Sequence, residues 1–354
     1  MMTWITILIV LFALWAVAQF YLSGPKLTHF DSATGEIFDD HEDDAAATQQ
    51  LMGLLEDVHQ QVTASKSLKK GLAIGRDFAD NLSQDLESDC EFTAVDVEGV
   101  KCEWTIAPES KSNRRVLFLH GGAFIFGSPK GHRIMSHQLA HIAKAAVLSV
   151  DYRMLPENKR RLACLDAQAT YRWILKNSPD GESPVEKLLV AGDSAGGNLA
   201  LMLSSWSKRG ADRRPDATIG FSPSLDTTLN SPTFKSNAAT DPLLGQALGA
   251  LKKVPNTISL WIGFILMRCN PSDKEVSPLF DDLSELPPTL IHASTTEVLL
   301  GDAIRYTNKA AAEGSNVKLQ LWKNQVHDWH LFSRNSGSGK QAWSEISKFV
   351  EQTL

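Results

Sequence analysis

Short apolar runs alternate with amphipathic stretches through most of the chain. Six mostly apolar runs have the length and composition of strands, at 116–119, 146–150, 188–191, 217–221, 289–292 and 317–321. Between them, apolar residues recur with helical spacing at 132–145, 163–176, 298–312 and 341–350. Strands separated by helices of about 10 to 15 residues indicate crossover connections. The pattern therefore predicts an α/β fold with a mostly parallel central sheet and helices on both of its faces.

The chain before residue 115 has a different pattern. Segments 92–97 and 100–106 alternate apolar and polar residues and are separated by Glu98-Gly99, which predicts a β-hairpin. Segments 45–62 and 68–82 have helical periodicity. We expect both of these segments to be amphipathic helices whose apolar stripes pack on the rest of the protein.

An insertion interrupts the later strand–helix alternation. Residues 224–276 are rich in Asn and Pro and contain two more apolar segments, 243–252 and 258–267. We expect this insertion, together with residues 39–85, to form a helical cap over the sheet. The chain is thus predicted to comprise a hydrophobic segment, a tether with cap helices, and an α/β domain that carries the insertion, with boundaries at 1–23, 24–88 and 89–354.

The first residues form an uncharged apolar segment. Residues 3–22 carry no charged side chain, and about 20 apolar residues suffice for a helix to cross a bilayer core of about 30 Å. Trp4 and Tyr21 lie near its ends, where interfacial aromatic rings are favoured. We predict a single-pass N-terminal membrane anchor with the α/β domain outside the bilayer. The alternative is a signal peptide removed on export, for which Ala16-Val17-Ala18 is a passable cleavage site but the basic start is absent.

The chain between this segment and the first amphipathic helix has no regular pattern. Residues 23–38 contain two glycines and a proline and are predicted to be an irregular tether. Residues 39–44 are a mostly acidic run, which we expect to be the solvated start of the next helix.

The composition of the chain argues against some classes of function. The chain has 354 residues, of which 43% are hydrophobic and 21% charged, as in a globular protein. Its formal net charge of −6 argues against nucleic acid as a partner. The four cysteines, Cys90, Cys102, Cys164 and Cys269, form no CxxC pair and no Cys/His spacing typical of a metal site. We therefore expect structural thiols and no bound metal, and a single disulfide bridge stays open as an alternative.

One stretch carries the signature of a nucleophilic serine. The apolar run 188–191 leads into Gly192-Asp193-Ser194-Ala195-Gly196-Gly197, and a helical pattern follows. Strand, tight turn and helix are the context of a nucleophile elbow, in which small neighbours let the serine project from the turn. We predict that Ser194 is the nucleophile of an acyl-transfer reaction. The N–H groups of Ala195, Gly121 and Gly122 are the expected oxyanion donors, since the two glycines follow an early strand.

The remaining members of a catalytic triad should follow the serine in the chain, the acid first and then the base. Among the three histidines after Ser194, His327 lies in a loop after a strand, whereas His292 and His330 have surroundings typical of packing. Glu297 follows the strand 289–292 and is the predicted acid. The competing acid is Asp302, which should lie five residues further along, within a helix.

Three motifs together resemble a known family. His120-Gly121-Gly122, Asp151-Tyr152-Arg153 with Pro156-Glu157, and the glycine-rich turn around Ser194 are similar, in this order, to the hormone-sensitive-lipase-like α/β-hydrolases. The resemblance runs from about Val116 to Phe332. It implies an α/β-hydrolase fold with a helical cap and cofactor-free hydrolysis of carboxylic esters. It places Ser194, Glu297 and His327 in the triad and Gly121, Gly122 and Ala195 in the oxyanion hole.

The chain departs from the family pattern at three places. Ala123 stands where the family has a third glycine, and it is compatible with the loop if its φ is negative. Lys159-Arg160-Arg161-Leu162 follows Pro156-Glu157 where the family usually has Phe-Pro. The acid position holds Glu297 where Asp is commoner, and a glutamate can reach the same imidazole.

These observations predict a serine carboxylesterase that acts on short to medium acyl esters through an acyl-enzyme, with a small-molecule ester as its substrate. Two alternatives remain. The first is a lipase or deacetylase of amphiphilic substrates, for which a membrane tether makes sense. The second is a ligand-binding receptor on the same fold, which the presence of all three triad residues disfavours. The sequence leaves acyl length, membrane orientation and a homodimer open.

Overall fold

The computed structural model of the chain describes residues 2–210, 213–245 and 254–354. Within them, nine strands form one sheet in the order β1-β11-β10-β9-β8-β4-β5-β3-β2. The strands from β1 to β5 in this order are parallel, and β3 and β2 are antiparallel to their neighbours. Their bounds are β1 Glu36–Phe38, β2 Glu91–Val97, β3 Val100–Ile106, β4 Lys111–Leu119, β5 Ala145–Asp151, β8 Lys187–Asp193, β9 Ala217–Phe221, β10 Thr289–Ser294 and β11 Val317–Trp322. The predicted α/β fold with a mostly parallel sheet is confirmed.

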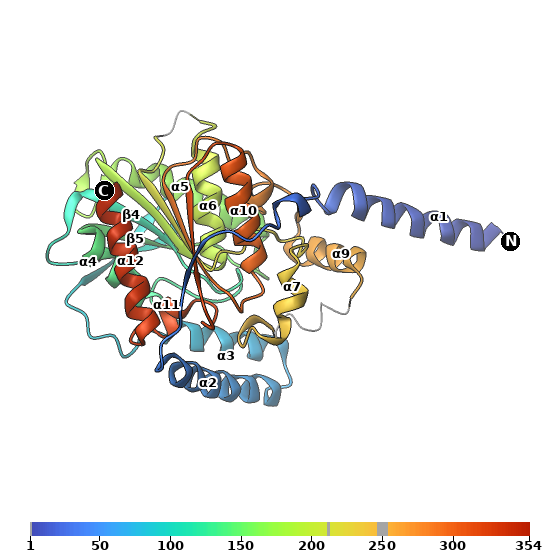
Figure 1. The fold of residues 1–354 in the computed structure, drawn as a ribbon, viewed down its shortest axis with the longest axis horizontal. Coiled ribbons are helices and arrows are strands. Elements are labelled where there is room, and N and C mark those ends of the chain that lie inside the picture. The colour runs from blue at the N-terminus through green and yellow to red at the C-terminus, as the bar shows by residue number, and fades with distance from the viewer. Residues whose placement is uncertain (1, 211–212, 246–253) are drawn as a thin grey trace.

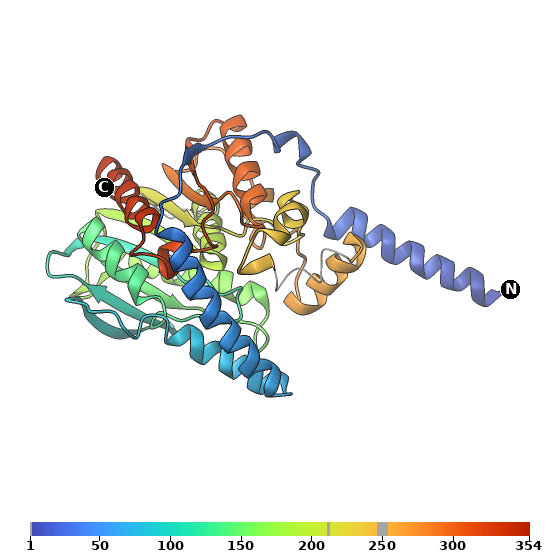
Figure 2. The same cartoon turned by 60° about the horizontal axis from the view of Figure 1, so that its bottom comes forward.

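The helices form layers on both faces of the sheet (Figures 1 and 2). The helices are α1 Met2–Val17, α2 Asp44–Ala64, α3 Leu68–Asp80, α4 Arg133–Ala143, α5 Arg160–Ile174, α6 Ala195–Ser207, α7 Thr233–Ser236, α9 Asn256–Met267, α10 Leu300–Ala312, α11 Trp329–Phe332 and α12 Gly337–Thr353. One face carries α4 and α12, and the other carries α5, α6 and α10.

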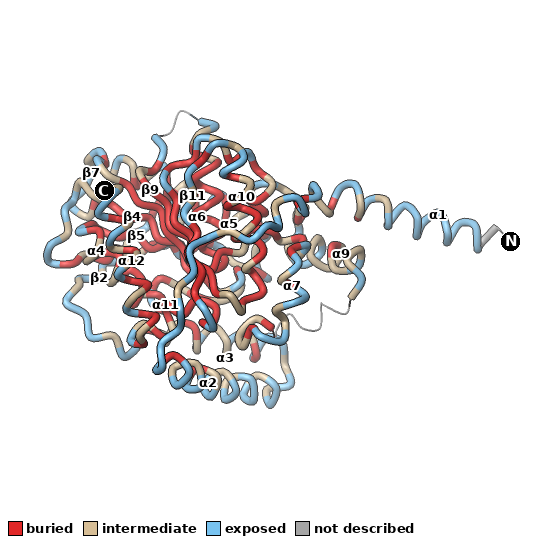
Figure 3. Tube along the Cα trace, viewed as in Figure 1, coloured by how far each residue is buried: buried red, intermediate tan, exposed pale blue. Residues whose placement is uncertain are grey.

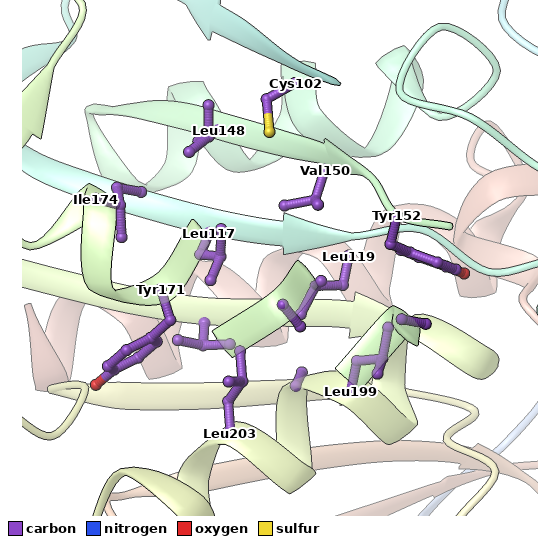
Figure 4. Close-up of a cluster of buried hydrophobic side chains, with 14 of the residues drawn as sticks. Cys102, Leu117, Leu119, Leu148, Val150, Tyr152, Tyr171, Ile174, Leu199 and Leu203 are labelled. Atoms are coloured by element: carbon purple, nitrogen blue, oxygen red, sulfur yellow. The ribbon is translucent and has the colours of Figure 1, made fainter. Parts of the chain in front are cut away.

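The apolar runs form strands of the central sheet, and helices cover both faces of these strands. In β4, Leu117 and Leu119 pack toward α5 and α6, whereas Val116 and Phe118 pack toward α4 and α12. Figure 4 shows the first of these layers, with Leu117 and Leu119 beside the side chains of the neighbouring strand and helices. Side chains alternate along a strand, so a strand buried on both faces must be apolar throughout. Figure 3 shows the resulting buried sheet at the centre of the protein.

Helices α2 and α3 form an antiparallel pair beside the main body (Figures 1 and 2). Arg76 of α3 makes a bidentate ion pair with Glu157, with nitrogen–oxygen distances of 2.9 and 2.8 Å. Ser83, just after α3, accepts from the N–H of Ile134 in α4 and donates to the carbonyl of Gly131. These contacts fix the end of α3 against the loop that precedes α4.

Helix α1 projects from the body as an isolated rod (Figures 1 and 2). A π-helical turn, Ala18–Leu22, continues it, and Ala18 and Leu22 pack against Leu260 of α9. The Glu98-Gly99 hairpin forms as predicted between β2 and β3. Of the two apolar segments predicted in the insertion, 258–267 lies within α9, whereas most of 243–252 falls outside the described residues.

Two predictions for the N-terminal arm were wrong. The tether 23–38 ends in β1, which pairs with β11 over only three residues, too few for a periodic pattern to show in the sequence. The acidic run 39–44 is not solvated throughout, because Asp44 is buried and accepts hydrogen bonds from Gln325 and Ser338. The start of α2 is therefore tied to the C-terminal part of the chain.

Candidate active site

Ser194 occupies the sharp turn between β8 and α6. Its backbone has φ 50° and ψ −110°, a conformation that L-residues rarely adopt and that often marks functional sites. A Cβ on Gly196 would lie 1.8 Å from the carbonyl oxygen of Leu119, and one on Gly192 would lie 2.4 Å from the backbone of Gly196. The turn therefore requires glycine on both sides of the serine, which is the physical basis of the motif seen in the sequence.

The structure brings together the three residues predicted as a triad. The Oγ of Ser194 lies 2.9 Å from Nε2 of His327, and Nδ1 of His327 lies 2.7 Å from Oε2 of Glu297. Glu297 is held by a second bond, because its Oε1 accepts from the N–H of Ser294 at 2.9 Å. All three side chains are buried. The carboxylate can thus fix the imidazole with its Nε2 lone pair facing the serine hydroxyl.

The loops after β10 and β11 place the acid and the base side by side. The two strands are parallel neighbours, so their following loops leave the same edge of the sheet. The carbonyl of Gln325 accepts hydrogen bonds from the hydroxyls of Ser294 and Thr296, which ties the two loops together. The side chain of Gln325 in turn reaches Asp44 at the start of α2. The arm that carries the N-terminal helices therefore supports the loop that carries His327.

The competing candidates have other partners. Asp302 is buried in α10, where it accepts from the N–H groups of Leu225 and Asp226, and burial raises its pKa to about 7. His292 and His330 are buried and lie 2.9 Å apart, nitrogen to nitrogen. Burial lowers the pKa of both histidines. These three residues belong to the packing of the domain.

Gly122 and Ala195, two of the predicted oxyanion donors, adjoin the serine. Gly122 lines the same cavity as Ser194, and Ala195 is the first residue of α6, where a backbone N–H has no acceptor within the helix. In the described part of the chain, the N–H groups of Gly121 and Gly122 have no hydrogen-bond acceptor. A Cβ on Gly122 would lie 2.3 Å from the carbonyl oxygen of Phe126, so the loop needs glycine there. Among the described residues, the arrangement leaves the N–H groups of these three residues without a backbone acceptor.

The structure does not meet the condition of a negative φ under which Ala123 was expected to be tolerated. Its φ is +56°, and that of Phe124 is +60°. For a residue with a Cβ, this left-handed conformation costs roughly 1–2 kcal/mol. The carbonyl of Gly122 holds the turn by accepting from the N–H groups of Ile125 and Phe126, at 3.0 and 2.8 Å. The loop therefore forms this turn with Ala123 in a left-handed conformation.

Buried polar side chains pack against the oxyanion loop and hold it in place. His120 stacks on Tyr152, with ring centroids 4.3 Å apart, and its Nδ1 donates to the carbonyl of Gly121 at 2.8 Å. Burial lowers the pKa of His120 to about 3, so this ring is neutral. His132 lies 3.3 Å from Asp193; burial lowers its pKa, but the carboxylate outweighs burial and the net shift is upward. The loop and the elbow are thus joined by a charge-assisted contact.

Sequence reasoning missed one residue of this site. Asp328, next to the predicted base, lines the same cavity, and its Oδ2 lies 3.1 Å from Nε2 of His327. Its backbone is left-handed, with φ 56°, which turns the side chain back over the imidazole. The His-Asp pair was visible in the sequence, but the direction of the second side chain depends on this backbone conformation.

The contact between Asp328 and His327 shifts the pKa of both groups. Burial raises the pKa of Asp328 to about 7. Burial alone would lower the pKa of His327, but the carboxylates of Asp328 and Glu297 raise it well above its usual value. A histidine acts as a general base only with a free lone pair, so a raised pKa of His327 would restrict that role to higher pH.

The pH dependence of kcat/KM should show the effect of Asp328 on the pKa of His327. We expect kcat/KM to rise with pH along an acid limb that lies above the ordinary histidine pKa of about 6.5. Asp328→Asn removes the anion that favours the imidazolium, so the limb should move to lower pH by about one unit or more. Asp96→Asn, at the exposed β2–β3 turn, removes one charge elsewhere and should leave the limb in place. An unchanged limb in Asp328→Asn would show that the carboxylate does not raise the pKa of His327.

A large apolar cavity opens onto the serine. Its volume is about 870 Å³, within the range of small-molecule sites. Apolar side chains of α2 and α3 line one side, and the oxyanion loop, Ser194, His327 and Asp328 line the other. The apolar lining residues on the first side are Leu55, Val58, Val62, Leu68, Leu72 and Phe78. The cavity can therefore enclose an apolar chain whose end reaches the nucleophile.

Comparison with known proteins identifies the family. Residues 116–331 match a protein-family model described as the alpha/beta hydrolase fold. An esterase of Acinetobacter venetianus is 33% identical over 72% of this chain and 80% of its own length. The carboxylesterase/phospholipase LipF of Mycobacterium tuberculosis is 33% identical over 68% of this chain, which spans 62% of LipF. A crystal structure of an esterase from the bacterial hormone-sensitive lipase family has 28% identity and a TM-score of 0.73, with 87% of this chain and 98% of that chain covered.

The chain belongs to the α/β-hydrolase fold family. Its resemblance to the hormone-sensitive-lipase-like members, inferred from the three motifs, is confirmed by these relatives.

Proposed function

We propose that this protein is a serine carboxylic ester hydrolase with Ser194, His327 and Glu297 as its catalytic triad. The observation that carries the proposal is the continuous hydrogen-bonded chain from Ser194 Oγ through His327 to Glu297, at 2.9 and 2.7 Å. The relatives named esterase and carboxylesterase support the same reaction class.

The geometry supports a two-step reaction. Oγ of Ser194 attacks the ester carbonyl while Nε2 of His327 takes the hydroxyl proton. The tetrahedral oxyanion accepts hydrogen bonds from the N–H groups of Gly121, Gly122 and Ala195. The imidazolium then protonates the leaving alcohol, and an acyl-enzyme remains on Ser194. Water activated by the same imidazole releases the acid and restores the serine.

The cavity supports esters with an apolar acyl chain of short to medium length. Helices α2 and α3, which we propose form the cap with the insertion 224–276, cover the cavity with aliphatic and aromatic side chains. Apolar burial contributes roughly 0.8 kcal/mol per CH₂, so binding should improve with each methylene until the cavity is filled. Longer chains would have to leave the cavity.

Hydrolysis of p-nitrophenyl esters with acyl chains of graded length tests this proposal. We expect kcat/KM to rise from acetate to a medium chain and then fall. The control is the Ser194→Ala variant, which removes the nucleophile and leaves the cavity intact. Hydrolysis of every ester at the rate of that variant would contradict the proposed function.

The first helix supports a second proposal, that the enzyme is anchored to a membrane and meets amphiphilic esters there. Among the described residues, one helix is long and apolar enough to cross a bilayer, Trp4–Leu22, with a mean hydropathy of 2.3. Its surface is mostly exposed, unlike that of a core helix in a soluble protein. A cleaved signal sequence has the same composition, so processing has to be measured.

Helix α9 supports the anchor and indicates where the bilayer surface lies. Its Trp261 donates from Nε1 to the carbonyl of Leu14 at 3.2 Å, so α9 lies against the base of α1. Ile258, Ile265 and Leu266 of α9 are all more than half exposed. These apolar side chains beside an anchor fit a helix that lies in the membrane interface.

The anchor prediction is tested by fractionation. Full-length protein should stay with membranes after washing with high salt or alkaline carbonate. A chain that begins at Ala18 keeps the residues that pack on α9, and it should be released and remain active on soluble esters. Release of the intact protein by salt alone would contradict an integral anchor. A mature N-terminus near Gln19 would instead identify a cleaved signal.

The contribution of α9 is tested with esters presented in two forms. Replacing both Ile265 and Leu266 with Glu should lower the rate on acyl esters embedded in phospholipid vesicles several-fold, because charged side chains disfavour the apolar interface. The rate on a soluble p-nitrophenyl ester should not change. Glu substitutions at Gln49 and Gln50, exposed on α2, add the same two negative charges and serve as the matched control. Equal losses on both substrate forms would contradict interfacial contact by α9.

A further inference from the structure

Four metal-binding side chains converge at the junction between the N-terminal arm and the α/β body. Asp89 and Cys90 lie immediately before β2, and His137 and His141 lie one turn apart on α4. Each offers one ligand atom, and all four atoms lie within 4.8 Å of one another. The elements that bring them together are distinct from those that carry Ser194, His327 and Glu297.

The distances between these atoms are close to those of a tetrahedral site. Sγ of Cys90 lies 3.3 Å from Nδ1 of His137 and 3.7 Å from Nε2 of His141. Oδ1 of Asp89 lies 2.8 Å from Nε2 of His141, 3.9 Å from Nδ1 of His137 and 3.9 Å from Sγ of Cys90. Ligands of tetrahedral Zn²⁺, at about 2.0–2.3 Å from the ion, lie about 3.3–3.6 Å from each other. Small side-chain rotations would therefore place an ion at the centre.

The ligand set selects the kind of metal. One thiolate, two imidazoles and one carboxylate are typical ligands of zinc, whereas Ca²⁺ and Mg²⁺ prefer oxygen ligands alone. The thiolate of Cys90 and the carboxylate of Asp89 together carry two negative charges, which balance a divalent ion. The spacing of His137 and His141 places both rings on one face of α4, with centroids 4.6 Å apart.

We propose that Asp89, Cys90, His137 and His141 form a structural zinc site. On binding, Nδ1 of His137 and Nε2 of His141 donate their lone pairs to the ion. The Cys90 thiol releases its proton to solvent as the sulfur–zinc bond forms. Ser88, whose Oγ lies 3.0 Å from Nδ1 of His137, gives up this contact when the imidazole turns to the metal.

The site would connect the cap helices to the catalytic domain. Residues 81–90 join α3 to β2, and α4 begins directly after the loop that carries Gly121 and Gly122. A metal bridge between this segment and α4 would hold the end of the α3 arm and the helix behind the oxyanion loop in fixed relation. Zinc should therefore stabilise the fold while leaving the catalytic groups themselves unchanged.

This site was not predicted from the sequence, from which we expected no bound metal. Cys90 has no second cysteine nearby, and 46 residues separate it from His137. The two histidines at i and i+4 are the sequence signal, but such a pair is common on helix surfaces. Only the packing of the segment before β2 on α4 supplies the other two ligands.

Cobalt substitution tests the proposal with a signal that does not depend on activity. Metal-free full-length protein, purified in detergent, should bind one equivalent of Co²⁺ and develop the near-ultraviolet sulfur-to-cobalt charge-transfer band together with the visible bands of tetrahedral Co²⁺. Added Zn²⁺ should displace the cobalt and abolish both signals. Zn²⁺ should also raise the Tm in proportion to the logarithm of its free concentration, since it binds the folded state.

Matched variants identify the ligands. Cys90→Ser should abolish the charge-transfer band, and Cys269→Ser, which removes another half-buried thiol, should retain it. His141→Asn should weaken zinc binding more than 100-fold, since even outer-shell partners contribute about 10- to 100-fold. If wild-type protein binds less than one equivalent with no charge-transfer band, or if the band persists in Cys90→Ser, the proposal is wrong. Because the wild-type titration needs no variant, a variant that fails to fold does not prevent the test.

Discussion

Replacing Ser194 with alanine should lower kcat for ester hydrolysis by about 10⁶, the loss found when the nucleophile of a serine protease triad is removed. The side chain is small and buried, so its removal leaves only a small space at the tip of the elbow. The strained backbone of Ser194 is held by its neighbours, because its N–H donates to the carbonyl of Phe221 at 2.8 Å and its carbonyl accepts from Ser224 at 3.1 Å. The variant should therefore fold and bind substrate, with its loss confined to kcat.

A control serine and a covalent label make this result specific. Ser205 lies on α6, the helix that follows Ser194, and its hydroxyl donates to the carbonyl of Met202, so Ser205→Ala should keep its kcat. A phosphonate ester should label the wild-type protein once, at Ser194, and should not label Ser194→Ala. Labelling at a different serine would move the nucleophile to that residue.

The parts of the fold that could be predicted are those in which a structural requirement acts on consecutive residues and leaves a pattern in the sequence. The strands of the central sheet are buried on both faces, so runs such as 116–119 are apolar without a break and can be recognised locally. The elbow was also predictable, because the close approach of Gly196 to Leu119 excludes a side chain and leaves a motif in the sequence. In both cases, a local requirement determines the residue type.

What could not be predicted depends on contacts between distant segments. β1 is a strand only because β11 offers it an edge, and Asp44 is buried only because Gln325 and Ser338 reach it. Asp328 joins the candidate site through a left-handed backbone angle that its sequence neighbours do not specify. Each of these residues has an ordinary local sequence, and its role follows from tertiary packing.

The second large effect concerns the base and its carboxylate. His327→Ala should lower kcat nearly as much as Ser194→Ala, because nucleophile and base act as a unit and neither activates the reaction alone. The double variant should therefore be little worse than either single one. A loss in the double variant equal to the product of the two single losses would indicate independent roles.

Glu297→Gln should lower kcat by roughly 10⁴, through a change in the histidine tautomer. Oε1 of Glu297 accepts from the N–H of Ser294, so the amide oxygen of a glutamine must take this position. The amide NH₂ then faces Nδ1 of His327 and makes it an acceptor, which puts the imidazole proton on Nε2, toward Ser194. The opposite amide orientation would set two donors, the NH₂ and the N–H of Ser294, against each other.

The matched control for this substitution is Asp302→Asn, at the other acid considered from the sequence. Asp302 accepts from two backbone N–H groups and from Ser231, and it makes no contact with His327 among its described hydrogen bonds. Because the pKa of Asp302 is raised to about 7, this carboxyl group is partly protonated near neutral pH, and an asparagine resembles the protonated form. We therefore expect a lower Tm for Asp302→Asn with kcat per folded molecule nearly unchanged. If Asp302→Asn were instead the crippling change and Glu297→Gln nearly silent, the hydrogen bond from His327 to Glu297 would not be the one that orients the base.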